Sequence, residues 1–143
     1  MRVKALLEAK GKEVYSMESD NTVEQAIEMM ASKKISAVLV TEDKKPVGIF
    51  TERDVLRSYL AKRGASFHDI PLKDVMTTNV IIAEPNEELC NVMSVMIEKG
   101  IRHMPVSEKG VIIGMLSIRD VLKTQIGNLK AEIHYLKDYI AGA

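Results

Sequence analysis

The strongest constraint in this sequence is that it repeats itself. An ungapped shift of 66 residues carries Asp20–Arg57 onto Asn86–Lys123, and within that span Gly48 falls on Gly114 and Asp54 on Asp120. Chance does not keep one register without a gap over such a length. The chain therefore contains a duplicated unit, and both copies are expected to share one fold.

Each copy has the same order of expected elements, which is β-α-β-β-α. Apolar residues at helical spacing predict the first helix, and β-branched runs separated by polar residues predict the two strands that follow it. In the first copy we expect an extended segment, a helix, two strands and a helix at Val14–Met17, Thr22–Lys33, Ile35–Val40, Pro46–Phe50 and Glu52–Ala61. In the second copy, the extended segment, the first strand and the final helix are expected at Val80–Ala83, at Ile101–Val106 and from Ile118 onward.

One such unit buries little apolar surface, so two copies packed together make a better core. The sequence therefore predicts an α+β protein whose two βαββα repeats pack sheet to sheet with pseudo-two-fold symmetry and leave a cleft between them. The expected parts are a first repeat, a linker, a second repeat and a C-terminal amphipathic helix, at residues 1–62, 63–71, 72–124 and 125–143.

Charge and composition exclude several broad functions. Twenty basic residues balance twenty acidic ones, which argues against non-specific binding to nucleic acid or to an anionic membrane. No apolar run reaches the roughly 18–20 residues that span a bilayer, and the start lacks the apolar stretch of a signal peptide. The single cysteine, Cys90, suits a reducing compartment, so we expect a cytoplasmic protein.

The sharpest local motif lies where the second strand of each copy meets the final helix. Backbone N–H groups at such a corner favour an anion such as phosphate. A hydroxyl there can bind phosphate, a carboxylate one turn later can accept from ribose hydroxyls, and a glycine lets a ligand approach the backbone. The residues are Gly48, Thr51 and Asp54 in the first copy and Gly114, Ser117 and Asp120 in the second.

The same motif has a purely structural interpretation. Ser/Thr-x-x-Asp resembles a helix capping box, in which Thr51 would cap the helix and Asp54 would reach back to it. For the residues alone, capping and ligand binding remain open alternatives.

A basic pair opens the first strand of the second copy. The guanidinium of Arg102 and the imidazole of His103 both suit phosphate recognition, whereas the first copy has Ser36 and Ala37 at these positions. A phosphate site would therefore be asymmetric, and a solvated strand end is the alternative. Two further arginines, Arg53 and Arg119, are equivalent to each other and also fit an exposed helix face.

Signatures of catalysis and of metal binding are missing from the sequence. It has no Gly-x-Ser-x-Gly, His-Glu-x-x-His or Gly-x-x-x-x-Gly-Lys-Ser/Thr motif, and its three histidines are far apart. We therefore expect neither an enzyme nor a metal site.

Taken together, the duplication and the paired motifs resemble a tandem pair of CBS domains, also called a Bateman module, over about residues 4–123. The resemblance implies a sensor that binds AMP, ADP, ATP, NAD or S-adenosylmethionine between the repeats. It implies that Asp54 and Asp120 bind ribose, that Thr51 and Ser117 meet phosphate, and that Arg102 and His103 contact phosphate. Adenine would lie among the residues Val14, Tyr15, Ile35, Ser36, Ala37, Val80, Ile82 and Ile101.

The C-terminal tail shows a second pattern. Apolar residues alternate at spacings of four and three, which is a heptad pattern, at Leu122, Ile126, Leu129, Ile133, Leu136 and Ile140. A helix that packs on its own core and a helix that pairs two chains both fit it, and Gly127-Asn128 could bend such a helix. The resemblance favours a homodimer, because CBS modules commonly pair.

The sequence thus predicts a homodimeric, non-enzymatic sensor of energy or redox state that binds an adenine nucleotide and acts on another, unidentified protein. The main alternative is a dimeric interaction scaffold that works without a ligand. A nucleotide hydrolase and a nucleic-acid binder are the weaker alternatives.

Overall fold

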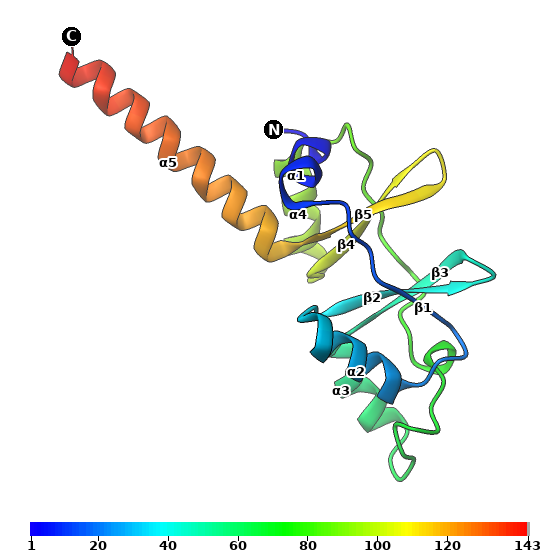
Figure 1. Cartoon of the computed structure of the whole chain (residues 1–143). Coiled ribbons are helices and arrows are strands. Elements are labelled where there is room, and N and C mark those ends of the chain that lie inside the picture. Colours follow the sequence, from blue (N-terminus) through cyan, green and yellow to red (C-terminus); the bar gives the residue numbers. More distant parts are fainter. Residues whose placement is uncertain (143) are drawn as a thin grey trace. The chain divides into compact units, whose positions relative to one another are not determined.

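The computed structural model describes residues 1–142 and divides into two compact units. One unit comprises residues 13–81, and the other comprises residues 1–12 together with residues 82–143. We call them the first unit and the second unit and describe each by itself (Figure 1). Both combine a small sheet with helices, as the α+β prediction requires.

The first unit holds a three-stranded sheet in the order β1-β2-β3. β1 (Ser16–Glu18) runs parallel to β2 (Ala37–Glu42), which pairs antiparallel with β3 (Lys45–Thr51). The turn between β2 and β3 places Asp43 and Lys44 at φ of 50° and 68°, the left-handed conformation of a tight hairpin. This hairpin confirms the polar turn expected between the two strands.

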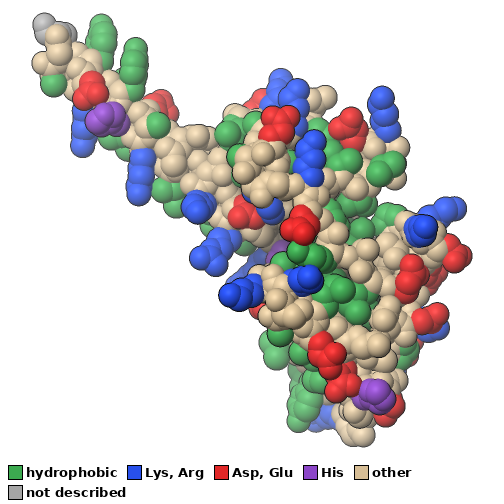
Figure 2. Space-filling model, in the orientation of Figure 1, with side chains coloured by type: hydrophobic (Ala, Val, Ile, Leu, Met, Phe, Trp, Pro, Cys, Tyr) green, Lys and Arg blue, Asp and Glu red, His purple; other side chains and the backbone are tan. Residues whose placement is uncertain are grey.

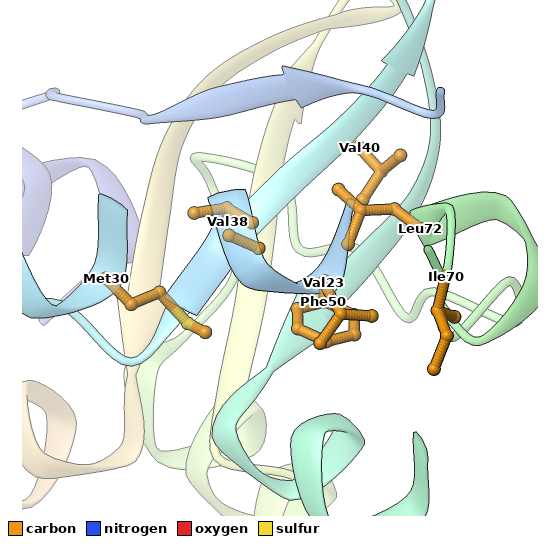
Figure 3. Close-up of a cluster of buried hydrophobic side chains, with 8 residues drawn as sticks. Val23, Met30, Val38, Val40, Phe50, Ile70 and Leu72 are labelled. Atoms are coloured by element: carbon orange, nitrogen blue, oxygen red, sulfur yellow. The ribbon is translucent and has the colours of Figure 1, made fainter. Parts of the chain in front are cut away.

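The helices of the first unit are α2 (Val23–Lys33) and α3 (Glu52–Ala61). α2 begins one residue after the predicted start, because Thr22 forms a capping box with Gln25 and is the N-cap. Its apolar face and the middle of the sheet form a buried core, in which Phe50 is the largest side chain (Figure 3). The core members are Val23, Ala26, Met30, Val38, Val40, Phe50, Ile70 and Leu72.

The second unit is built from α1 (Val3–Lys10), α4 (Leu89–Lys99), β4 (His103–Glu108), β5 (Val111–Ser117) and α5 (Ile118–Gly142). β4 and β5 form an antiparallel pair. The extended segment expected at residues 80–83 is reduced to one bridge, in which Ala83 pairs parallel with Val106.

The compact units do not follow the repeat boundaries drawn from the sequence. α1 lies in the predicted first repeat but belongs to the second unit, where Val3 N donates to Glu87 O and Lys4 N to Pro85 O. Conversely, the short 3-10 helix Leu72–Asp74 lies at the start of the predicted second repeat but belongs to the first unit, together with the linker. Residues 1–12 thus pack in the second unit and residues 63–81 in the first, and we call these two stretches the exchanged segments. Local sequence patterns do not reveal this long-range exchange.

The C-terminal helix α5 is continuous through Gly127 and Asn128 (Figure 1). Val121 is its one buried residue, and residues 126–142 are all exposed. Within the structure described here, this part of the helix does not pack on the core of its own chain. Ala143, the last residue of the predicted tail, lies outside the described residues. Over residues 1–142, no helix is long and apolar enough to cross a membrane.

Candidate functional site

In the first unit, the strand-to-helix corner is a complete capping box. Thr51 is the N-cap of α3; its backbone N–H donates to Asp54 Oδ2 at 3.0 Å, and Asp54 N–H donates back to Thr51 Oγ1 at 3.4 Å. The capping interpretation of this motif is therefore confirmed in the first repeat.

The carboxylate of Asp54 is also enclosed by the chain around it. Its side chain is 2% exposed, and its second oxygen, Oδ1, accepts a hydrogen bond of 3.0 Å from the hydroxyl of Thr77. Arg57 Nη1 lies 3.5 Å from the same oxygen. A buried carboxylate with partners on both oxygens stabilises the corner, and a ligand would have to displace Thr77 or Arg57 to reach it.

The equivalent corner of the second unit is more open. Ser117 Oγ donates to Asp120 Oδ2 at 2.7 Å and accepts from Asp120 N–H at 3.1 Å, so the serine caps α5. The Asp120 side chain is 34% exposed, in contrast to the enclosed Asp54. This corner combines a helix N-terminus, a hydroxyl and an accessible carboxylate, which are the groups that the ligand interpretation requires.

A lysine that the sequence analysis did not single out contacts this carboxylate. Lys10 Nζ, at the end of α1, lies 2.7 Å from Asp120 Oδ2 and donates to Met115 O at 2.6 Å. The repeat register offers no hint of it, because Lys10 falls on Met76. Its role depends on the packing of α1 with the second unit.

The hydrogen bonds at this corner outweigh the effect of burial on the pKa of Asp120. Burial alone would raise it, but the bonds from Lys10 and Ser117 hold the pKa of the carboxyl below its ordinary value. Asp120 is therefore ionised at neutral pH and able to accept further hydrogen bonds. Both side-chain bonds end on Oδ2, so a carboxylate with about four acceptor positions retains capacity for a ligand.

The predicted basic pair lies beside Asp120. His103 opens β4 and is the direct cross-strand partner of Ser117, while the backbone carbonyl of Arg102 accepts from Ile118 N–H at 2.8 Å. Burial, followed by the charges of Lys10 and Arg102, lowers the pKa of His103 against an opposite effect of Asp120. The imidazole is thus mainly neutral at pH 7, and the Arg102 side chain is exposed.

The first unit gathers its own group of predicted residues. Ala37 pairs with Thr51 across the sheet, and the carbonyl of Ser36 accepts from Glu52 N–H at 3.1 Å. The Tyr15 ring has Lys33 Nζ 5.6 Å from its centre, and a hydrogen bond with Glu13 raises the pKa of its phenol. Arg53 is exposed, and half-buried side chains at Val14 and Ile35 complete this group.

The remaining predicted residues divide between the two units. Val80 belongs to the first unit and is half-buried, whereas Ile82, Ile101 and Arg119 belong to the second. Ile82 and Arg119 are exposed, and Ile101 is half-buried. That the two groups line one cleft stays a prediction.

The two motif glycines do not make room for a ligand, so this part of the sequence interpretation is wrong. A Cβ at Gly48 would lie 2.8 Å from both Met76 Sδ and the backbone oxygen of Thr77. A Cβ at Gly114 would lie 2.7 Å from a side-chain carbon of Leu7. In both repeats, the exchanged segment fills the space that the glycine leaves.

A separate hollow of about 590 Å³ occurs in the second unit. It lies between α1, residues 84–86 and the hairpin that joins β4 to β5, and it is lined by both lysines and glutamates. None of the predicted ligand residues lines it. Among residues 1–142, no three His, Cys, Asp or Glu side chains are grouped so as to hold a metal ion.

Comparison with known proteins agrees with this architecture. The family model for the CBS domain matches the chain twice, at residues 10–61 and 72–127. A solved CBS-domain protein, NE2398, is 40% identical with a TM-score of 0.83, and the match covers 88% of this chain and 98% of that one. The CBS domain pair of MJ0100, solved in complex with 5-methylthioadenosine and S-adenosyl-L-methionine, has a TM-score of 0.78 over 90% of this chain and 98% of that one; at 22% identity, it shows the fold alone.

A curated relative gives the same result. The mitochondrial CBS domain-containing protein CBSX3 of Arabidopsis thaliana is 33% identical over 129 residues, which is 87% of this chain. The chain spans 62% of that plant protein's length. On these matches, together with the duplicated fold and the two capped corners, the chain belongs to the CBS-domain family and carries two copies of the domain.

Proposed function

We propose that this chain is a regulatory module that binds an adenine nucleotide, with the ribose at Asp120. The observation that carries the proposal is the cluster in the second unit, where a partly exposed, ionised carboxylate lies beside a serine hydroxyl, a lysine and a histidine. Vicinal ribose hydroxyls are donors that such a carboxylate accepts. The complex of MJ0100 with two adenosyl ligands supports this ligand class.

The other polar groups around Asp120 suit phosphate. Lys10 carries a positive charge at the corner, and Ser117 stands at the N-terminus of α5, where the helix dipole favours an anion. Arg102 and His103, from β4, are the further candidates for phosphate contacts. AMP, ADP, ATP and NAD all provide the ribose and phosphate that this set would recognise, and S-adenosylmethionine provides the ribose alone.

We propose that the predicted apolar and backbone positions contact the adenine ring. They are Val14, Tyr15, Ile35, Ser36, Ala37, Val80, Ile82 and Ile101. In this proposal Thr51 and Asp54 mainly maintain the corner of the first unit, since the carboxylate is enclosed. The module would work as a cytoplasmic homodimer that passes its ligand state to another protein, without catalysis of its own.

Calorimetry with AMP, ADP, ATP, NAD and S-adenosylmethionine, one at a time, tests the proposal. Asp120→Asn should weaken binding about tenfold or more, because a bond to a charged acceptor is lost. Asp138→Asn is the matched control, since this carboxylate on α5 is exposed and contacts His134 on its own helix. Equal affinity for the wild type and Asp120→Asn would refute the ribose assignment.

A ligand-independent scaffold is the second candidate, and the exposed apolar residues of α5 favour it. A ligand at 100 times its dissociation constant should stabilise the fold by about 2.7 kcal/mol, which is visible as a higher melting temperature. If none of the five compounds changes the melting temperature, the scaffold function is the better explanation.

A further inference from the structure

The apolar side chains of α5 form one exposed stripe. Six of them, from Leu122 to Ile140, are between 39% and 76% exposed. Figure 2 shows hydrophobic side chains along the part of this helix that extends from the second unit. Exposed apolar residues in a continuous stripe are typical of a protein interface rather than of a solvated helix.

The order of residue types in the stripe indicates what kind of interface it is. In the heptad register abcdefg, every a position is isoleucine (Ile126, Ile133, Ile140) and every d position is leucine (Leu122, Leu129, Leu136). In a parallel coiled coil, isoleucine at a with leucine at d favours an assembly of two helices over one of three or four helices. The residue types thus favour a pair of helices, and the direction of the pair follows from the flanking charges.

The charged residues that flank the stripe also favour a parallel pair. All three e positions are lysines (Lys123, Lys130, Lys137), and Glu132 occupies a g position. In a parallel pair each g position faces the e position of the next heptad, so Glu132 would meet Lys137 of the partner subunit. In an antiparallel pair, e positions face e positions, and the lysines would repel one another.

We call the a and d positions of the stripe the seam; residues on the outer side of the helix do not belong to it. Gly127 occupies a b position, and a Cβ there would meet nothing within 4 Å. His134 Nε2 and Asp138 Oδ2, at b and f, lie 3.2 Å apart along the outer face. The contact between His134 and Asp138 therefore lies on the solvent side of the helix, away from the apolar stripe.

We infer that α5 pairs with α5 of a second copy of this chain as a parallel, in-register, two-stranded coiled coil. The inference deepens the proposed homodimer by naming its surface and direction, and it is independent of nucleotide binding at Asp120. Six seam positions form a short coiled coil, so helix pairing depends on the folded units that hold the start of α5 in place.

Sedimentation of the full chain tests the seam. The wild type should have twice the mass of the chain, and Ile133→Glu should weaken the dimer more than about tenfold because it places a charge in an apolar seam. Tyr135→Glu is the matched control, since Tyr135 is 70% exposed on the same helix but lies at an outer c position. A monomeric wild type, or equal dimerisation of Ile133→Glu and Tyr135→Glu, would overturn the inference.

Disulfide trapping tests the direction. In a Cys90→Ser background, which removes the exposed native thiol, Ile140→Cys alone should form a disulfide-linked dimer under mild oxidation, as should Leu122→Cys alone. An antiparallel pair would give cross-links only when the two variants are mixed, and that result would overturn the parallel assignment. Nucleotide affinity measured on the same variants should equal that of the wild type, so failure here is distinguishable from failure of the ligand site.

The g–e pair provides a final check. Glu132→Lys should weaken the dimer by placing lysines opposite each other, and Lys137→Glu in the same chain should restore it. Weakening by each change without recovery in the double variant would overturn the parallel pairing of these positions.

Discussion

The two strand-to-helix corners occupy equivalent positions in the two repeats and yet hold their carboxylates in different ways. Asp54 is buried and has partners on both oxygens, including Thr77 from the exchanged segment. Asp120 is partly exposed and has its side-chain bonds from Lys10 and Ser117 on one oxygen. The same residue type in the same register thus stabilises the fold in one repeat and remains accessible in the other.

The two exchanged segments account for the different environments of the two carboxylates. Residues 63–81 supply the neutral hydroxyl of Thr77 to the corner of the first unit, and residues 1–12 supply the ammonium group of Lys10 to the corner of the second. By the repeat register, Thr77 falls on Gly11 and Lys10 on Met76, so the two corners receive their partners from different positions. The role of each carboxylate is therefore set by residues outside the shared motif.

The largest expected difference between the corners is in stability. Asp54→Ala should lower the free energy of unfolding by about 2–4 kcal/mol, because it removes the acceptor of the Thr51 backbone N–H in the capping box and leaves the half-buried Thr77 hydroxyl without its acceptor. Asp120→Ala should cost less than about 1 kcal/mol, since its ion pair with Lys10 is partly exposed. Urea denaturation of both variants measures this, and equal losses would contradict the distinction.

The motif glycines should give the next largest effect. Gly48→Ala should destabilise by about 1–3 kcal/mol, because its new methyl group meets the backbone oxygen of Thr77, which cannot move independently. Gly114→Ala should cost less, since the atom in its way is the end of the Leu7 side chain. Melting temperatures of the two variants test the order, and a larger loss at Gly114 would reverse the argument.

Replacing Lys10 removes the positive charge that distinguishes the corner of the second unit from that of the first. Lys10→Met introduces the residue that stands at the equivalent position 76 and should weaken binding of a phosphate-bearing nucleotide by about three- to tenfold. Adenosine, which lacks phosphate, should lose less affinity. Calorimetry with ATP and adenosine measures the contrast, and an equal loss for both ligands would show that Lys10 does not contact phosphate.

The smallest expected effect is a pH dependence of the second unit. Burial lowers the pKa of His103, so the imidazole binds a proton more readily in the unfolded chain than in the folded protein. The free energy of unfolding should therefore fall as the pH falls below about 6.5. His103→Ala, which introduces the residue of the first repeat, should remove this part of the dependence. Denaturation of both proteins between about pH 7.5 and 5.5 tests it, and an identical slope would contradict the assignment to His103.

Much of the fold could be predicted because its signals are local. The helix Glu52–Ala61 has the predicted bounds, and α2 begins one residue after the predicted start because Thr22 caps it. In contrast, α1 had no counterpart in the prediction, since its position depends on contacts with residues 85–89. The exchange also hid Lys10, which reaches Asp120 from 110 residues away.

The candidate site was harder to predict because one motif fits two interpretations. Thr-x-x-Asp and Ser-x-x-Asp match both a helix cap and a proposed ligand-binding group, so the residues alone do not separate Asp54 from Asp120. The glycines were assigned to ligand approach, but Met76, Thr77 and Leu7 occupy the space beside them. Only the neighbours brought in by the fold distinguish the two roles.

The packing of α1 with the second unit has a consequence for synthesis on the ribosome. The first unit has its whole sequence once residue 81 has emerged, whereas Val3, Leu6 and Leu7, all buried in the finished protein, depend on residues 82 and beyond. At typical translation rates of about 5–20 residues per second, this apolar N-terminal segment stays without its core for roughly 5 to 20 seconds. Once residue 81 has emerged, and until the second unit is complete, the nascent chain presents a folded first unit joined to an apolar segment that chaperones can bind.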